Sequence, residues 1–384
     1  MSLFDSDQNL YDDREAVTDG YVPDELVGRA PERAALTAAL DPDGSGTASD
    51  VLVWGPPGTG KSTFVKRVLD STLGSGEGEV AYVDCSAFST PYQVAARVAD
   101  ELDEESFNTT GHSREDVYDA LDRACSDSAA KFVALDGVEA LAGSDLLDLF
   151  LDDGRFATAT LVGVADVTDL PESRFDGQLG GVQTVRFERY SVSELRELLR
   201  TRASYAFTDH TLSEEVVPLC AAYAMETDRG ATEAIALLRT AGDVAARQLD
   251  SRIAGYHVQR AREEREHDRL RSRLGDVDVH GRLTLYAVVA AGFADETPLR
   301  TRDVYDRYRS LAHVGGRDSL VVRRVRVRLS TLADRNLLTV RKHNEGRGGG
   351  VYREYDLPTD PETMAEVLSA AANLSDVHRS AVPS

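Results

Sequence analysis

Short apolar runs alternate with segments of helical spacing over the first half of the chain. The runs end at polar or glycine positions and cover residues 51–54, 79–84, 131–136, 160–165 and 182–187, which predicts buried strands. Before and between them, apolar residues recur every three or four positions, which predicts helices over 31–40, 63–69, 90–102 and 113–125. Strands alternating with helices predict an α/β fold with a parallel sheet covered on both faces.

The pattern becomes purely helical after Ser191. Apolar residues at helical spacing predict helices over 193–204, 213–223 and 232–249, which together form a small all-α domain. The following stretch, 259–273, is rich in both acids and bases and is typical of a solvated linker helix rather than a binding surface.

The last part of the chain has a third pattern. Helices are predicted over 283–291, 301–312 and 319–336, followed by strands at 337–341 and 351–357 with a glycine-rich tip between them. Three helices followed by a hairpin predict a winged helix, whose third helix enters the major groove of DNA. The predicted division is a mobile tail over 1–20, an α/β domain over 21–190, a helical domain and linker over 191–275, a winged helix over 278–358 and a tail over 359–384.

Charge is distributed unevenly along the chain. The formal net charge is −23, yet residues 281–360 contain 15 Lys and Arg against 10 Asp and Glu. This module is therefore basic, whereas the rest of the chain is acidic. Within this module, Arg323, Arg324 and Arg328 crowd the third helix, and Lys342 and Arg347 lie at the hairpin tip. We expect these five residues to contact double-stranded DNA. The alternative is a winged helix used only for protein contacts, which the local positive charge disfavours.

The remaining composition bears on the compartment. No apolar run approaches the ~20 residues of a membrane helix, and the acidic N-terminus does not resemble a signal peptide. Cys85, Cys125 and Cys220 are widely spaced, which favours buried thiols over disulfides or a zinc site. These features predict a cytoplasmic protein with no membrane partner. Only four of the 43 basic residues are lysine, which with the carboxylate-rich surface suggests a halophile.

A phosphate-binding loop follows the first predicted strand and precedes a helix. It has the spacing G-x-x-x-x-G-K-[ST] and consists of Gly55, Pro56, Pro57, Gly58, Thr59, Gly60, Lys61 and Ser62, with Thr63 next in the helix. Backbone N–H groups of such a loop surround phosphates, the lysine reaches the outer phosphates, and the hydroxyl binds Mg²⁺. The full spacing in this context disfavours a chance glycine turn. We therefore expect ATP or ADP with Mg²⁺ as cofactors.

The strand over 131–136 ends in an acid. Asp136 is expected to act in catalysis by holding Mg²⁺, as the acid of a Walker B strand does; an ordinary strand-terminal aspartate is the alternative.

With these motifs in place, the chain from Tyr21 to Leu357 resembles the archaeal initiators related to the first subunit of the origin recognition complex and to cell division control protein six. The matching stretches are 21–29, the phosphate loop, the Asp136 strand, 187–190, 237–242 and the winged helix. The resemblance implies an AAA+ base with a helical lid, and an ATP-gated protein that binds replication origins, helps recruit the replicative helicase and works beside other initiator paralogues. It also implies that Val22, Tyr190 and Arg202 contact the nucleotide.

Several positions depart from the family pattern. Gly137 stands where the family has a glutamate that activates water, Asp166 where it has an asparagine near the γ-phosphate, and Thr232 where it has a sensor arginine. Arg229 could substitute for that arginine, and Arg174 aligns with an arginine that could reach a neighbouring subunit. Glycine has no group that can hold a water, so we expect hydrolysis to be slow or absent.

Two alternatives remain open from the sequence. One is a regulator of transcription or plasmid maintenance that keeps the initiator fold and uses nucleotide structurally, which the altered catalytic positions favour. The other is an active remodelling or clamp-loading ATPase, which Gly137 disfavours.

Overall fold

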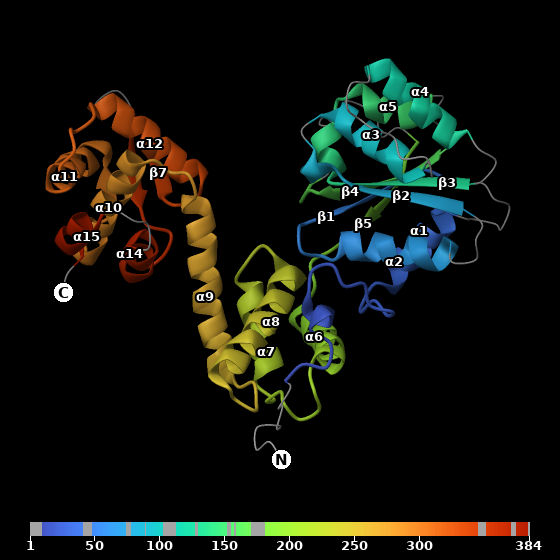
Figure 1. Ribbon diagram of the computed structural model, residues 1–384, viewed down its shortest axis with the longest axis horizontal. Helices are drawn as coiled ribbons and strands as arrows, with labels where there is room; N and C mark the ends of the chain where they lie inside the picture. Colours follow the sequence, from blue (N-terminus) through green and yellow to red (C-terminus); the bar gives the residue numbers. More distant parts are fainter. Residues whose placement is uncertain are drawn as a thin grey trace, which may run out of the picture. The chain divides into compact units, whose positions relative to one another are not determined.

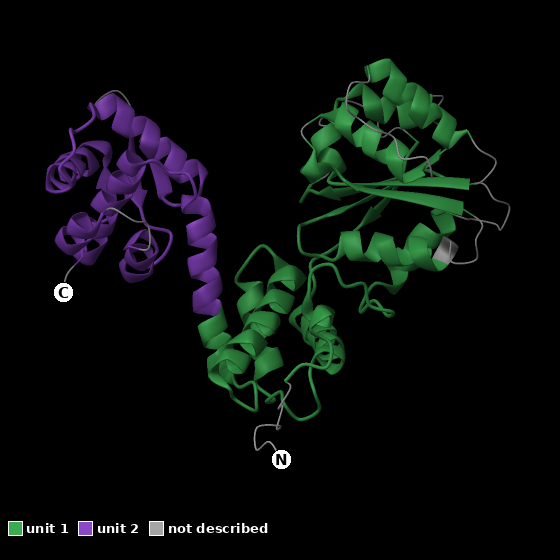
Figure 2. Ribbon diagram, viewed as in Figure 1, with its two compact units in different colours: residues 1–261 green, residues 262–384 purple. Residues whose placement is uncertain are grey.

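The computed structural model describes residues 10–40, 48–73, 78–88, 90–102, 113–126, 130–151, 155–156, 159–169, 181–344, 351–369 and 374–382. The chain divides into two compact units, residues 1–261 and 262–384 (Figure 2). The first unit holds the α/β domain and the helical domain. The predicted linker helix is α9 (Gly255–Leu274), and the boundary between the units falls inside it.

A five-stranded parallel sheet forms the centre of the α/β domain, as predicted. Its strands are β1 (Val51–Gly55), β2 (Gly78–Asp84), β3 (Ala130–Asp136), β4 (Ala159–Asp166) and β5 (Gln183–Arg186). Their spatial order is β2-β3-β4-β1-β5 (Figure 1). Strand β1 therefore lies between β4 and β5, and Gly55, where the phosphate loop begins, is in register with Asp166.

Helices cover both faces of this sheet (Figure 1). Helices α1 (Ala30–Leu40) and α2 (Lys61–Leu73) pack on one face through a core that includes Leu36, Phe64 and Val53. The other face carries α3 (Pro91–Leu102), α4 (Arg114–Cys125) and α5 (Asp145–Phe150). Short 3₁₀ turns, η2 (Cys85–Ala87) and η3 (Val138–Leu141), follow β2 and β3. The sequence pattern did not predict α5, which is less than two turns long.

The helical domain consists of α6 (Val192–Ala206), α7 (Val216–Met225) and α8 (Gly230–Gln248). Each lies close to its predicted bounds. Helix α6 begins at a capping box, in which the side chains of Ser191 and Glu194 bond to each other's backbone N–H groups.

The prediction of a mobile tail over residues 1–20 is wrong for its described part, 10–20. Leu10, Ala16 and Val17 are buried against the helical domain, and residues 14–17 form a 3₁₀ turn, η1 (Arg14–Val17). The Tyr11 hydroxyl has two acceptors for its proton within hydrogen-bond distance, the Arg239 carbonyl at 3.0 Å and the Asp243 carboxylate at 2.9 Å. The apolar residues are too few and too irregular to produce a periodic signal, yet they fit a groove that only the folded helices provide.

The second unit contains the predicted winged helix. Its helices are α10 (Val279–Phe293), α11 (Thr301–Val314) and α12 (Val322–Asp334). Strands β6 (Leu299–Arg300), β7 (Thr339–Asn344) and β8 (Val351–Asp356) form an antiparallel sheet in the order β6-β8-β7.

The prediction of a simple tail over 359–384 is also wrong for the described residues. Helices α14 (Pro361–Ser369) and α15 (Ser375–Ala381) pack on the winged helix, with Met364, Leu368 and Val377 fully buried. These residues complete the core around α10 and α11, so they belong to the second unit.

Within the described part of the chain, none of the helices is long and apolar enough to cross a membrane. Cys85, Cys125 and Cys220 are buried, as the sequence predicted.

Candidate nucleotide site and DNA-contacting surface

The phosphate loop connects β1 to the first residue of α2 at the carboxyl edge of the sheet. Gly58 and Gly60 both have positive φ, +72° and +84°, which side chains rarely adopt. A Cβ at Gly58 would lie 1.7 Å from the Arg229 carbonyl oxygen, and one at Gly60 would lie 3.2 Å from the Tyr190 hydroxyl. Glycine is therefore required both for the loop's shape and for the close approach of the helical domain, which forms a lid over the loop.

Lys61 points back into the loop. Its ammonium donates to the carbonyl oxygens of Gly55 and Pro56 at 2.9 and 2.7 Å. It also lies 2.6 Å from a carboxylate oxygen of Asp166, which the sequence identified only as a replacement for the family's asparagine. The Lys61 side chain is 2% exposed and the Asp166 side chain 55% exposed, so the negative partner faces the open side of the site.

Ser62 and Asp136, the two predicted Mg²⁺ ligands, are brought together around the Tyr82 hydroxyl. This hydroxyl donates to Asp136 at 2.6 Å and is also hydrogen-bonded to the Ser62 side chain. Burial, and then the negative charge of Asp136, raise the pKa of Tyr82 well above its usual value. Neutral Tyr82 thus donates to Asp136 and accepts from Ser62, and in this way positions both oxygen ligands, a role that sequence reasoning missed.

The position after Asp136 carries no side chain that could activate water. Gly137 has φ +75°, and a Cβ there would meet nothing closer than 3.8 Å. The next acid, Glu139, accepts a hydrogen bond from the Asp166 backbone N–H at 3.3 Å. Glu139 is therefore engaged with the Asp166 backbone.

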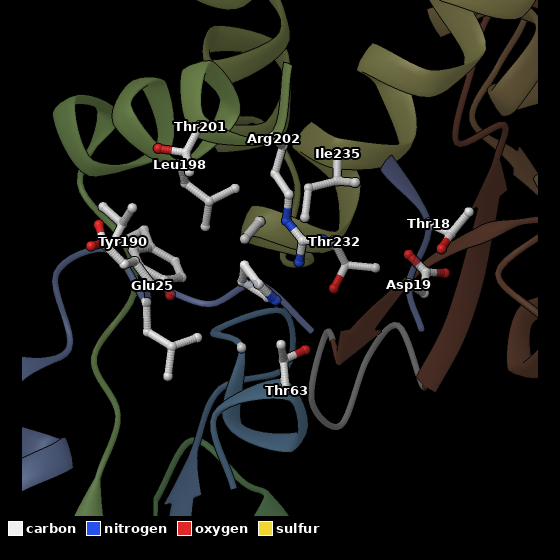
Figure 3. Close-up of a pocket in the computed structure, with 15 residues that line it drawn as sticks. Thr18, Asp19, Glu25, Thr63, Tyr190, Leu198, Thr201, Arg202, Thr232 and Ile235 are labelled. Atoms are coloured by element: carbon white, nitrogen blue, oxygen red, sulfur yellow. The ribbon is translucent and has the colours of Figure 1, made fainter. Parts of the chain in front are cut away.

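A pocket opens beside the loop, between the α/β domain and the lid (Figure 3). Its lining includes Gly60 from the loop, Thr63 from α2, Tyr190, Arg202 from α6, and Thr232 from α8. Two predicted nucleotide contacts, Tyr190 and Arg202, are thus at the pocket. Val22 is half-buried and is not among the lining residues, whereas its neighbour Pro23 is.

Arg202 binds the N-terminal segment. Its guanidinium donates to the carbonyl oxygens of Ala16 and Tyr21 at 3.0 and 3.1 Å and lies over the Tyr21 ring. The same segment contributes Thr18 and Asp19 to the pocket (Figure 3). Arg202 therefore holds one wall of the pocket in addition to lining it.

Arg29 is a second residue whose role sequence reasoning missed. It is 5% exposed, and its guanidinium lies over the rings of Phe187 and Tyr190, at 4.6 and 4.1 Å from their centroids. It also donates to the carbonyl oxygens of Thr59 in the loop and Glu188 before the lid. Arg29 lies in the stretch 21–29 that matched the family, and this was the only available signal.

The lid contacts the loop directly. The Ala231 N–H donates to the Gly58 carbonyl at 2.9 Å, at the start of α8. Thr232, in the position of a sensor arginine, lines the pocket, while Arg229 is exposed one residue before the helix. The backbone at 229–231 therefore packs directly on the loop.

On the winged helix, α12 presents an exposed row of arginines. Arg323, Arg324 and Arg326 are exposed, with Val322 and Val327 exposed among them. Positive side chains with interspersed apolar ones suit phosphates and thymine methyl groups.

The other predicted DNA contacts differ in their surroundings. Arg328 is 24% exposed and forms a two-pronged ion pair with Asp278, the residue that caps α10, so its charge is already neutralised. Lys342 is exposed on β7. Arg347, like Arg174, lies outside the described residues.

The glycine loop, the buried lysine and the adjoining pocket fit a nucleotide with its phosphates on the loop. The fold and site define a class: a P-loop AAA+ protein with a helical lid and a winged helix. Family models match in that order: an AAA ATPase domain over residues 25–205, a Cdc6 AAA+ ATPase-type lid domain over 196–263, and a CDC6 C-terminal winged helix domain over 273–367.

Relatives match along the whole chain. The ORC1-type DNA replication protein 11 of Haloarcula marismortui is 30% identical over 397 residues, which cover 99% of this chain and 96% of the relative. The ORC1-type DNA replication protein 1 of Aeropyrum pernix is 32% identical over 368 residues, 91% of this chain and 92% of the relative. The chain belongs to the ORC1/Cdc6 family of replication initiators.

Solved structures agree with this assignment. The Aeropyrum pernix ORC1 protein in complex with DNA matches with a TM-score of 0.78 and 30% identity, over 95% of this chain and 98% of that one. Cdc6p from Pyrobaculum aerophilum matches with a TM-score of 0.57 and 19% identity, over 97% of this chain and 100% of that one, which shows a likeness of fold alone.

Proposed function

We propose that this protein binds double-stranded DNA at replication origins through α12 and the wing, holds ATP or ADP with Mg²⁺ in the loop, and helps recruit the replicative helicase. The observation that carries the DNA-binding part is the exposed arginine row of α12 within an otherwise acidic chain. A net charge of −23 would repel DNA unless the contact surface concentrated positive charge. The match to a family member whose structure was solved with DNA also supports DNA binding.

The nucleotide site uses the residues described above. Backbone N–H groups of the loop and Lys61 would bind the phosphates, while Tyr190 and the segment held by Arg202 would enclose the base and sugar. Ser62 and Asp136, positioned by Tyr82, would hold Mg²⁺. When bound, the ion would neutralise part of the phosphate charge.

Hydrolysis is slow or absent in this proposal. A water needs an acceptor to orient and deprotonate it, and Gly137 has no side chain while Glu139 is engaged with the Asp166 backbone. Steady-state phosphate release by the purified protein in high potassium chloride tests this. We expect turnover far below ~1 per second, and a rate within the ordinary enzyme range would contradict it.

Mapping the protein's binding sites across the genome tests the origin-binding role. Enrichment at replication origins supports it, and enrichment confined to promoters or a plasmid locus would support a regulator instead. The regulator remains the second candidate because Gly137 and Asp166 alter catalysis while the loop is intact. Co-purification of the helicase, or of initiator paralogues, with the tagged protein tests those partners.

A further inference from the structure

The ion pair between Lys61 and Asp166 occupies the centre of the phosphate site. Asp166 ends strand β4, directly beside the start of the loop, because it is in register with Gly55. Its carboxylate reaches across to within 2.6 Å of the ammonium. The positive charge on which phosphate binding depends is therefore already paired with a negative group from the protein.

The ammonium has no spare donor. A lysine ammonium has three N–H donors. In this site they face the carbonyl oxygens of Gly55 and Pro56 and the carboxylate of Asp166, with the Thr59 hydroxyl at a longer 3.3 Å. Phosphate oxygens that bind Lys61 must displace one of these partners.

Asp166 is fixed at its backbone but open at its side chain. Its N–H donates to Glu139 and its strand pairs with β1, whereas its side chain is 55% exposed. Two groups that each contact one ammonium at ~3 Å lie within ~6 Å of each other. A phosphate bound to Lys61 is therefore held close to a fixed negative charge.

We propose that Asp166 is a specificity-determining residue that makes the site favour ADP over ATP. This inference rests on the proposed nucleotide-binding function. A P-loop lysine serves both the β- and the γ-phosphate. ADP needs one of its donors, whereas ATP needs a further donor and brings another negative group to the side where Asp166 lies. The carboxylate therefore penalises ATP more than ADP.

The test compares equilibrium binding of two Mg²⁺-nucleotides to the full-length protein. The probes are ADP and the non-hydrolysable β,γ-imido analogue of ATP, titrated calorimetrically at one fixed potassium chloride concentration. Asp166→Asn keeps the shape of the side chain and removes its charge. Asp169→Asn, at an exposed residue three positions further along the chain, removes the same charge nearby and serves as the matched control. Thermal melts establish that each variant is folded.

Wild type is expected to bind ADP more tightly than the ATP analogue. Asp166→Asn should shift the ratio of the two dissociation constants by about tenfold toward the analogue, mainly by strengthening analogue binding, while Asp169→Asn leaves it unchanged. An unchanged ratio in folded Asp166→Asn, or an equal shift in Asp169→Asn, would overturn the inference but leave nucleotide binding intact. Failure of folded wild type to bind either nucleotide would overturn the proposed nucleotide site itself.

Discussion

The phosphate loop and the recognition helix α12 use positive charge in opposite ways. Lys61 is 2% exposed, and its ammonium is fully engaged by loop carbonyls and Asp166. The arginines at 323, 324 and 326 are exposed along α12. A buried, paired charge holds its surroundings together and responds to a ligand by exchanging partners. An exposed row attracts a polyanion at long range, and this attraction weakens as the salt concentration rises. The difference fits the two proposed roles, a site that retains nucleotide and a surface that reads DNA.

Removing Lys61 should have the largest effect. Lys61→Ala loses charge-assisted hydrogen bonds to phosphate worth about 4 kcal/mol together, so ADP affinity should fall roughly 1,000-fold. Calorimetric titration with Mg²⁺-ADP measures this, and DNA binding by the same variant serves as the control. Undiminished ADP affinity would show that the loop does not bind phosphates.

A substitution of Arg29 tests whether its buried contacts stabilise the nucleotide site. Arg29→Ala removes a guanidinium buried against two aromatic rings and two hydrogen bonds to backbone carbonyls, so the free energy of unfolding should fall by roughly 3 kcal/mol. Denaturant titration checks the value. Arg33→Ala, an exposed arginine one turn along α1, is the matched control and should change stability little. An equal loss of unfolding free energy in the two variants would show that Arg29 has no special structural role.

Exposed and paired arginines on α12 should differ in their effect on DNA. Arg323→Ala should weaken binding to DNA about tenfold and reduce the slope of affinity against salt by about one ion. Arg328→Ala should do less, because Arg328 is already paired with Asp278. Fluorescence anisotropy at several salt concentrations compares them. A larger loss of DNA affinity in Arg328→Ala would show that Arg328 breaks its ion pair with Asp278 and contacts DNA.

The smallest expected effect concerns acid stability of the winged helix. Burial acts to raise the pKa of Asp278, but its hydrogen bonds from Arg328 and the Gly281 N–H outweigh this and lower the pKa. A carboxyl group whose pKa is lower in the folded state stabilises the fold at pH values above its unfolded-state pKa of ~4. This stabilisation is lost as the pH falls through the folded-state pKa. Because the carboxylate is half exposed, the contribution is under about 1 kcal/mol. Asp278→Asn should therefore flatten the decline in melting temperature below pH 4, and an unchanged profile would contradict it.

The parts that the sequence predicted are those with local signals. The loop spacing, the strand ending at Asp136 and the arginine-rich third helix can each be recognised within a dozen residues. Contacts between distant segments could not be predicted: Lys61 with Asp166, Arg29 with Phe187, and Tyr11 with the lid. The two predictions of a tail, over 1–20 and 359–384, were wrong for the same reason. The few apolar residues of these segments give no periodic signal, and they are buried only against surfaces formed elsewhere in the chain.

Sequence-specific protection of origin DNA is the most direct test of the account. The full-length protein and its Arg323→Ala/Arg324→Ala/Arg326→Ala variant would be footprinted in molar potassium chloride on origin DNA and on shuffled DNA of the same composition. Screening over ~3 Å at this salt suppresses long-range phosphate attraction, so contacts to base edges must carry recognition. We expect a discrete footprint on origin DNA for wild type alone. The same footprint from the variant, or equal protection of shuffled DNA by wild type, would contradict it.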